Sequence, residues 1–271
     1  MTVLVTGGTG LVGSRLLKRF VEAGIDTRAL ARTGKDLPIG VTRIEGDILS
    51  PETLVAAVEG VTDIIHLAAL FRTQDEVEIW KVNYEGTRNL IDAVIEHNPA
   101  ARFLMASTSN VYGPELSHPG REDDEVTAKQ AYPASKIAAE KELRESGLNW
   151  VVLRFPFVYG EKDGHMESIP GFISSMKWHP AKKLSVIHHE DIATAIELAL
   201  TGVMDTRVVN IADESPLTIY EISQIVGAIP QSSDEPLVNP WIGHVDASLS
   251  RSLGFQPKVA TVYQAQREGK L

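Results

Sequence analysis

The sequence VLVTGGTGLVG at residues 3–13 decides how the rest of the chain is interpreted. A short apolar run leads into three evenly spaced glycines, Gly7, Gly10 and Gly13, and an apolar pattern of helical period follows. This order predicts a buried strand, a tight turn and the start of a helix. Gly7 lets the chain turn sharply, Gly10 leaves room for a pyrophosphate, and Gly13 lets the helix pack closely on the sheet. Because the free amides at a helix start attract a doubly negative group, the stretch predicts a dinucleotide-binding site.

The composition is that of an ordinary globular protein. The 271 residues suffice for one large α/β domain, or for a main domain with a small second lobe. No apolar run approaches the ~18 residues that cross a bilayer, and no basic segment precedes the first strand, so we expect a cytoplasmic protein without a membrane partner. The absence of cysteine excludes disulfides, thiolate metal ligands and cysteine nucleophiles. The net charge of -10 argues against nucleic acid as a partner, because clustered lysines and arginines bind that backbone.

The residues after the second expected strand, residues 27–31, bear on the choice of cofactor. A site that prefers NAD usually places an acid about 20 residues after the glycines, where it accepts hydrogen bonds from the ribose 2′-hydroxyl. This chain has Arg32 there, with Lys35 close behind, and the nearest acid, Asp26, lies at the wrong end of the strand. A guanidinium suits a 2′-phosphate, so NADP is slightly favoured over NAD. The alternative is a surface arginine that stacks on the adenine.

Two further strand ends carry residues that a dinucleotide would contact. Residues 41–45 are expected to form a strand that ends before Asp47, an acid placed to accept a hydrogen bond from an adenine amino group. The alternative is that Asp47 caps the helix that follows. Residues 63–69 are expected to form the next strand, and the small residues at its end let the nicotinamide-side ribose approach the backbone. An amphipathic helix over residues 77–97 follows and carries Asn83.

The chemistry is expected at the next strand and helix. Residues 103–106 predict a buried strand that leads into a hydroxyl cluster at 107–109, on the edge where open α/β sheets bind ligands. Further on, the sequence YPASK begins a helix with proline in a first helical position, so Tyr132 and Lys136 share one face. A free phenol has a pKa of ~10. A neighbouring ammonium and an oxidised nicotinamide would lower that pKa and make Tyr132 a base, while Lys136 also bonds the ribose. The alternative is an exposed helix pair without function.

Together these motifs resemble a family, the extended short-chain dehydrogenase/reductases. That family includes sugar-nucleotide epimerases and dehydratases as well as the dihydroflavonol-reductase-like enzymes. The resemblance covers nearly the whole chain. It rests on TGGTGLVG at 6–13, GDI at 46–48, HLAA at 66–69, VNYEGTRNL at 82–90, STSNVYG at 107–113, YPASK at 132–136, LRFPFVYG at 153–160, HHEDIA at 188–193 and RSLGFQP at 251–257.

The resemblance implies roles for individual residues. Tyr132 would be the general acid/base, Lys136 its partner, and Thr108 the hydroxyl that holds the reacting oxygen. Asn83 matches the helix asparagine of the family's proton relay. The residues that would contact the cofactor, NADP or NAD, are Gly7, Thr9, Gly10, Leu11, Val12, Gly13, Arg32, Asp47, Ile48, Leu67, Ala68, Ala69, Asn83, Tyr132, Lys136, Phe155 and Pro156.

Departures from the family pattern limit what the resemblance implies about the substrate. Epimerases and dehydratases of the family typically carry a substantial nucleotide-binding lobe, whereas fewer than thirty residues separate Gly160 from His188 here, so we expect a compact pocket. Dehydratases usually follow the reactive hydroxyl with Asp-Glu, and the Ser-Asn at 109–110 argues against that chemistry. A diphosphate needs several basic groups. The candidates, each more simply a surface charge, are Arg72, Lys182, Lys183 and Arg207.

Three other features have simple interpretations. The adjacent His188 and His189 point different ways at a strand-to-helix join, which indicates a helix cap and a lobe contact rather than a metal site. The helices at 77–97 and 130–147 are candidates for a homodimer seam, although ordinary packing gives the same periodicity. The residues expected to form an apolar wall of the lobe are Phe172, Met176 and Trp178.

We therefore predict an α/β protein of Rossmann type, with a doubly wound parallel sheet and a small C-terminal substrate-binding lobe. Residues 1–154 would form the dinucleotide-binding core, and residues 155–271 would complete the sheet and form the lobe without a clean boundary. The expected activity is NAD(P)-dependent hydride transfer at a secondary alcohol or ketone. The enzyme would be either sugar-nucleotide epimerase-like or an NADPH-dependent carbonyl reductase, acting on a nucleotide sugar or on a small ketone or alcohol. The alternative is a non-catalytic regulatory protein of the same fold that senses NAD(P).

Overall fold

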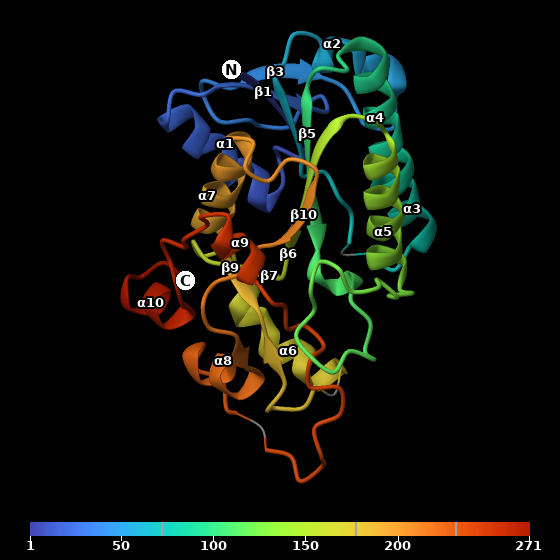
Figure 1. The fold of residues 1–271 in the computed structure, drawn as a ribbon. Helices are drawn as coiled ribbons and strands as arrows, with labels where there is room; N and C mark the ends of the chain where they lie inside the picture. Colours follow the sequence, from blue (N-terminus) through green and yellow to red (C-terminus); the bar gives the residue numbers. More distant parts are fainter. Residues whose placement is uncertain (72, 177, 231) are drawn as a thin grey trace.

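Seven parallel strands form the central sheet (Figure 1). The computed structural model describes residues 1–71, 73–176, 178–230 and 232–271, with only the backbone over 172–176. The sheet order is β10-β6-β5-β4-β1-β2-β3, and each neighbouring pair is parallel. The strands are β1 (Thr2–Thr6), β2 (Asp26–Ala31), β3 (Thr42–Glu45), β4 (Asp63–His66), β5 (Arg102–Thr108), β6 (Asn149–Phe155) and β10 (Arg207–Asn210). The order reverses between β1 and β4, which is the switch point where such sheets bind ligands. The predicted doubly wound Rossmann sheet is thus confirmed.

Helices cover both faces of this sheet (Figure 1). Because side chains of a strand alternate between faces, Val3 and Val5 of β1 pack with the α1 and α7 side, and Leu4 packs with the α4 and α5 side. A strand buried on both faces reads as a continuous apolar run, which is how the chain begins. The helices of the two layers are α1 (Leu11–Glu22) and α7 (His189–Leu200) on one face, and α2 (Val55–Val58), α3 (Glu76–Trp80), α4 (Gly86–His97) and α5 (Ala131–Glu145) on the other.

A smaller lobe lies beyond the carboxyl ends of the strands (Figure 1). It has its own apolar core, with Tyr159, Met166 and Ile222 among the buried residues. Its elements are the parallel pair β7 (Phe157–Tyr159) and β9 (Val186–His188), the antiparallel pair β8 (Lys183–Leu184) and β11 (Leu217–Thr218), and the helices α6 (His165–Met176), α8 (Ile219–Ile225), α9 (Ser248–Ser252) and α10 (Val262–Arg267). The chain beyond residue 154 therefore supplies both this lobe and two parts of the main layers, β10 and α7. The boundary placed there stays a prediction.

Several expected elements differ in detail. The strand expected at 63–69 ends at His66, and the strand expected at 103–106 runs from Arg102 to Thr108, so it includes part of the hydroxyl cluster. The long helix near 77–97 is interrupted by a π-helical turn, Lys81–Glu85. Pro133 occupies the third position of α5 rather than the first. Its missing N–H is harmless there because the first turn has no intrahelical acceptor.

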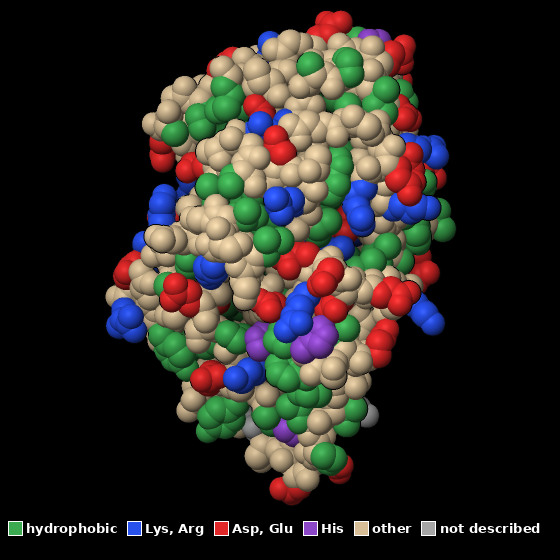
Figure 2. All heavy atoms as spheres, viewed as in Figure 1, with side chains coloured by type: hydrophobic (Ala, Val, Ile, Leu, Met, Phe, Trp, Pro, Cys, Tyr) green, Lys and Arg blue, Asp and Glu red, His purple; other side chains and the backbone are tan. Residues whose placement is uncertain are grey.

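The surface carries mixed charge. On the face shown in Figure 2, basic and acidic side chains are interspersed over both the sheet domain and the lobe. Among the described residues, no helix combines the length and the apolar character that crossing a membrane requires.

A buried acid lies where the lobe meets the sheet. The N–H of Asp213 donates to the carbonyl of Val186 at 2.8 Å, and its carboxylate Oδ1 accepts from the N–H of Ser215 at 3.1 Å. Its other oxygen, Oδ2, has no hydrogen-bond partner among the described residues. Burial raises the pKa of Asp213 to about 8, although the Ser215 bond and Arg251 oppose the shift. At neutral pH this side chain is therefore largely a neutral acid.

Asp213→Asn is expected to stabilise the protein at alkaline pH. An unfolded aspartate ionises near pH ~4, whereas the folded one keeps its proton until about pH 8. Folding thus binds an extra proton in this window, so the native Asp213 costs stability progressively as the pH rises from 4 to 8. Urea unfolding at pH 4, 6 and 8.5 should show the variant gaining roughly 2 kcal/mol or more at the highest pH. A difference that does not change with pH would contradict the buried, neutral state.

Candidate active site

The glycine loop lies against the end of β4 at the switch point. Gly7 has φ +73°, and its carbonyl accepts from the N–H of Gly10 at 3.0 Å. A Cβ on Gly7 would lie 2.6 Å from the backbone nitrogen of Ala68, and one on Gly13 would lie 2.2 Å from the Gly7 carbonyl oxygen. No side chain fits at either position, so the loop can pack on β4 and on the helix only as glycine.

The N-cap residue of α1 forms no side-chain hydrogen bond with the amides of the first turn. Gly10 is the N-cap and offers no capping side chain, and the first turn contains no acid. Thr9, Gly10 and Leu11 are exposed there. A helix of this length with uncovered amides is suited to a diphosphate. The glycine loop therefore fits the pyrophosphate of a dinucleotide on an observation of packing as well as on its motif.

The expected adenosine end brings together residues that follow β2 and β3. Asp47 Oδ1 accepts from the N–H of Leu49 at 2.9 Å. The N-cap of the following helix is Ser50, so the alternative that Asp47 caps that helix is wrong. Arg32 is exposed, with its Nε 3.9 Å from Asp47 Oδ2. Ile48 is buried and packs near Gly86, where a Cβ would come within 2.7 Å of its side chain.

Sequence reasoning missed Arg43 beside this group. The parallel register places Ala29 opposite Arg43 and Ala31 opposite Glu45. Arg43 Nη1 donates to the carbonyl of Arg32 at 3.3 Å, which makes a second cation part of this edge. The register of β2 against β3 brings Arg43 to this edge, and a short sequence motif contains no information about register.

Thr108 and Tyr132 meet at the carboxyl edge of the sheet. Thr108 is the last residue of β5 and is buried, and Tyr132 lies in the first turn of α5, half-buried. Burial raises the pKa of the Tyr132 phenol to about 12, and a side-chain hydrogen bond with Thr108 partly opposes that shift. The protein's own groups therefore keep Tyr132 a phenol at neutral pH. The lowering of its pKa that the sequence argument expected depends on the added charge of an oxidised nicotinamide.

Lys136 lies one turn along α5 from Tyr132 and is only 1% exposed. Burial lowers its pKa to about 8, and the charge of Glu140 works in the opposite direction. The ammonium is thus mostly protonated at neutral pH and titrates close to the physiological range. Residues four apart on a helix share a face. The geometry accordingly gives Tyr132 a buried cation as its helical neighbour.

Asn83 braces the site. Its amide nitrogen donates to the carbonyl of Leu70 at 2.8 Å and to Ser135 Oγ at 3.2 Å, and its Oδ1 accepts from the N–H of Leu70 at 2.7 Å. Ser135 Oγ in turn donates to the carbonyl of Tyr132 at 2.7 Å. Asn83 lies in the π-helical turn, a local geometry often found at functional sites. These contacts tie the loop after β4 to the first turn of α5, and the proton-relay role stays a prediction.

Two residues at this edge were missed from the sequence. The ring of Phe71 lies 5.3 Å from the ring of Tyr132, and its side chain is 54% exposed. His66, fully buried, bonds through its two ring nitrogens with Thr6 Oγ1 at 2.7 Å and Thr87 Oγ1 at 2.9 Å. Burial, helped by the charge of Lys136, lowers the pKa of His66 to about 3, so it is neutral.

The other residues predicted to contact the cofactor lie at or after the ends of β4 and β6 and in the first turn of α1. Phe155 pairs in register with Thr108, and Pro156 follows it into the lobe. Leu67, Ala68 and Ala69 follow β4 beside Gly7. Val12 is in the first turn of α1. Arg72 and the side chains of Phe172 and Met176 lie outside the described residues.

Trp178 and His188 in and beside the lobe have the structural roles that the sequence predicted. Trp178 packs against the lobe core, and Lys182 Nζ lies 4.6 Å from its ring centroid. His188 is the N-cap of α7 and accepts from the N–H of Glu190 at 3.1 Å, so its predicted capping role is confirmed. Within the described ranges, no group of three or more His, Cys, Asp or Glu side chains is arranged to hold a metal. Lys183 and Arg207 are exposed.

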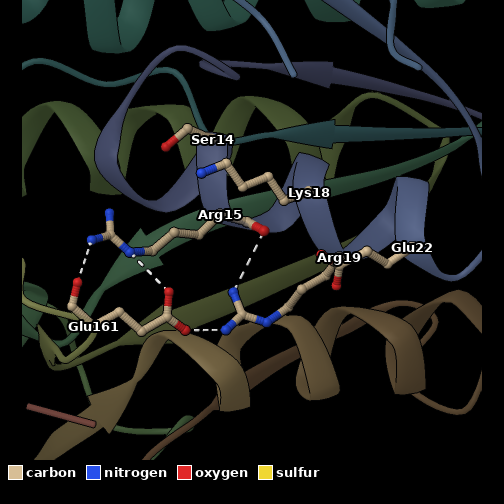
Figure 3. Close-up of a pocket in the computed structure, with 6 residues that line it drawn as sticks. All are labelled: Ser14, Arg15, Lys18, Arg19, Glu22 and Glu161. Carbon is tan, nitrogen blue, oxygen red and sulfur yellow. Dashed lines mark hydrogen bonds and ion pairs between the residues drawn. The ribbon is translucent and has the colours of Figure 1, made fainter. Parts of the chain in front are cut away.

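A cavity of about 380 Å³ lies on the outer side of α1, away from this centre (Figure 3). Glu161 bonds the guanidinium groups of Arg15, at 3.0 Å, and Arg19. Glu161 follows β7 and has φ 56°, a conformation that costs about 1 kcal/mol or more for a residue with a side chain. The ion pairs offset that strain and fasten the cofactor-side helix to the lobe. The residues lining the cavity are Ser14, Arg15, Lys18, Arg19, Glu22 and Glu161.

Comparison with known proteins places this geometry among nicotinamide-dependent enzymes. The model of the NAD dependent epimerase/dehydratase family matches residues 3–212. A 3-beta-hydroxysteroid dehydrogenase of Mycolicibacterium neoaurum is 28% identical over 251 residues, 83% of this chain and 69% of that protein. The mouse (Mus musculus) 3 beta-hydroxysteroid dehydrogenase type 7 is 32% identical over 194 residues, and the match covers 61% of this chain and about half, 52%, of that protein. The solved UDP-glucose 4-epimerase of Thermus thermophilus, in complex with NAD, has 25% identity and a TM-score of 0.77 over 96% of this chain and 95% of its own.

Asn83→Ala is expected to weaken cofactor binding roughly tenfold and to lower the free energy of unfolding by about 2 kcal/mol. The variant leaves the Leu70 backbone groups and Ser135 without their partner. The loop after β4 then loses its fixed position beside the glycine loop. Fluorescence titration with NADH and urea unfolding measure the two effects.

Asn98→Ala is the matched control. Asn98 also bonds two backbone carbonyls, those of Val58 and Val61, but at the opposite end of the sheet. It should lose stability to a comparable degree while binding NADH as the native protein does. Equal cofactor affinity in both variants would contradict the bracing role of Asn83.

Proposed function

Because the chain belongs to the NAD dependent epimerase/dehydratase family, we propose that it transfers a hydride between a nicotinamide cofactor and the carbon of a secondary alcohol or ketone. It is an enzyme of the extended short-chain dehydrogenase/reductase type. One observation carries the proposal: Tyr132 lies one helical turn from the buried Lys136 at the carboxyl edge of the sheet, where Thr108 ends β5.

Tyr132 is the proposed general acid/base. In oxidation the phenolate of Tyr132 takes the proton of the substrate alcohol and becomes a phenol, and in reduction the phenol gives that proton to the carbonyl oxygen and becomes a phenolate. Thr108 donates a hydrogen bond to the same oxygen and stabilises the charge that develops there. Lys136 favours the phenolate form of Tyr132 through its charge. The bound nicotinamide supplies or accepts the hydride.

The remaining residues hold the cofactor in this proposal. The glycine loop and the open start of α1 bind the pyrophosphate. Asp47 and Arg32 bind the adenosine end, residues 67–69 approach the second ribose, and Phe155 with Pro156 borders the nicotinamide. Arg32, with Arg43 beside it, supports a preference for NADP over NAD, because two cations at the adenosine edge suit a 2′-phosphate.

The proposed substrate is a nucleotide sugar or a small ketone or alcohol. The similar proteins point to both, since one is named UDP-glucose 4-epimerase and others hydroxysteroid dehydrogenase. An epimerase retains its cofactor and returns the hydride to the same carbon, whereas a reductase releases it each turnover. An assay of denatured protein for released NAD(H) distinguishes the two. The presence of Tyr132, Lys136 and Thr108 together favours either enzyme over a non-catalytic sensor.

A homodimer through α4 and α5 is part of the proposal. α3 and α4 expose Val77 at 77% and Ile95 at 43% beside these helices, which is apolar surface that a second copy can cover. The expected cytoplasmic location, and the expected absence of nucleic-acid and membrane partners, stay predictions.

Tyr132→Phe is expected to reduce turnover by at least a thousandfold while leaving cofactor affinity within about twofold, because only the proton-transferring hydroxyl is removed. A panel of UDP-sugars and small ketones, assayed by NAD(P)H absorbance or product analysis, supplies the measurement. Tyr84→Phe is the control, since the Tyr84 hydroxyl contacts Glu142 on the helix surface at 3.2 Å. Native turnover in Tyr132→Phe would remove this residue from the mechanism.

Arg32→Ala is expected to weaken NADPH binding at least tenfold more than NADH binding. The lost guanidinium would face a phosphate in one cofactor and a hydroxyl in the other. Arg28→Ala, within β2 just before Arg32 but bonded to the Glu59 carbonyl at 2.8 Å, should leave both affinities unchanged. An equal loss for the two cofactors would overturn the NADP preference.

A further inference from the structure

A buried ion pair lies one helical turn beyond Lys136. The carboxylate of Glu140 accepts from Arg154 Nη2 at 2.7 Å and from Arg154 Nε at 3.2 Å. Ser107 donates to the same carboxylate. Glu140 is 3% exposed and Arg154 2% exposed. Neither residue has a role in the mechanism proposed above. Removing two charges from water costs free energy, and apolar side chains of similar volume often give equal or greater stability. The pair therefore calls for a role other than stability.

The position of Arg154 is also fixed by Tyr112, after β5, and through it by Asn210, at the end of β10. Its Nη1 donates to the hydroxyl of Tyr112 at 3.0 Å, and its guanidinium lies 5.1 Å from the centroid of that ring. The Tyr112 hydroxyl donates to Asn210 Oδ1 at 2.8 Å, and Asn210 Nδ2 donates to the carbonyls of Gly120 and Asp246. This chain of contacts holds Arg154 in place, and Arg154 in turn holds the Glu140 carboxylate.

The periodicity of α5 places three reactive groups in one line. Tyr132, Lys136 and Glu140 follow one another at intervals of four residues, so they share one face of the helix. Glu140 is therefore next to Lys136, and Lys136 separates Glu140 from Tyr132.

The other groups that face Lys136 do not supply a second negative charge. From β4 comes His66, which is neutral, and the cation of β6, Arg154, is bonded to Glu140 itself. The hydroxyl of Ser107, on β5, bonds Glu140, and the amide of Asn83, in the π-helical turn, bonds Ser135, the residue before Lys136. Among the described residues around it, Glu140 is the one carboxylate next to the ammonium.

We propose that Glu140, locked by Arg154 and Ser107, is a positioning residue that keeps Lys136 charged and so sets the proton affinity of the Tyr132 phenol. The inference rests on the proposed function of the Tyr132–Lys136 pair. The burial of Lys136 favours loss of its proton, and the adjacent carboxylate opposes that loss. Without the Glu140 charge, the pKa of Lys136 would fall further, and the phenolate would lose part of its support.

The test is a pH titration of tyrosinate absorbance in the NAD⁺-loaded protein, with the Tyr132→Phe protein subtracted. Glu140→Gln is expected to move the apparent pKa of Tyr132 upward by about one pH unit. Glu140→Asp keeps the charge and should titrate close to the native protein. Ser107→Ala removes a hydrogen bond to the same carboxylate but no charge, and should also titrate like the native protein.

The Lys136→Met variant distinguishes a positioning role of Glu140, exerted through Lys136, from a purely structural role of Glu140. If Glu140 acts through Lys136, then adding Glu140→Gln to Lys136→Met causes no further shift. A shift of the same size in both backgrounds, or no shift in Glu140→Gln alone, would overturn the proposal. If Glu140→Gln does not fold, the double variant Glu140→Gln with Arg154→Met removes both buried charges together. The apparent pKa of Tyr132 is expected to move upward in this variant as well. A titration curve equal to that of the native protein would overturn the proposal.

Failure of the proposed function would be recognised separately, since the native protein would not bind NAD⁺. In that case the same four combinations of residues 136 and 140 are compared in the cofactor-free protein by urea unfolding between pH 6 and pH 10. A favourable coupling between Glu140 and Lys136 is expected at pH 6 and should disappear above about pH 8, where Lys136 loses its proton. A coupling of zero throughout would overturn the inference on Glu140.

Discussion

The close approach of the Gly7 backbone to Ala68 is the constraint on which the site depends. With a Cβ of Gly7 only 2.6 Å from the Ala68 nitrogen, the first loop and the end of β4 can meet only if the loop has no side chain. The same loop receives α1 at Gly13, where the tolerance is smaller still. These contacts set where the open helix start lies relative to the loop after β4. Asn83 then carries that position to α5, because it bonds Leu70 on one side and Ser135 on the other. Tyr132 is thus placed by a series of backbone contacts that begins at the glycines.

Charge in the interior is arranged around α5 in a way that the overall composition hides. The chain carries a net charge of -10, yet the face of α5 that points at the sheet holds Lys136 and is met by Arg154, with Glu140 between them. This interior cluster has one more positive than negative charge. Such an excess favours the ionised phenolate of Tyr132, so the same buried charges that cost stability are useful to an acid/base.

Local patterns predicted most of the fold and the residues with motif-level chemistry. The continuous apolar run of β1 follows from burial on two faces and the helical period of α1 from burial on one, so Val3, Leu4 and Leu17 were readable from the sequence. The spacing of Tyr132 and Lys136 was readable for the same reason. Contacts between residues distant in the chain were not. Phe71 on Tyr132, Arg43 beside Arg32 and the pair Glu140–Arg154 each depend on strand register or helix packing, which no short pattern contains. The π-helical turn also escaped prediction, because an extra residue in one turn leaves the apolar period nearly intact.

The lobe joins the cofactor domain through two polar connections with different consequences. Arg15 and Arg19 bond Glu161 on the outside of α1, which fixes the start of the lobe against the helix that would bind the pyrophosphate. The inner connection runs from the carbonyl of Asp246, ahead of α9, through Asn210, Tyr112 and Arg154 to Glu140 on α5. The outer connection is partly exposed and contributes modestly, as surface ion pairs do. The inner one is buried, and movement of the segments that Asn210 holds, near Gly120 and Asp246, would be felt at Arg154.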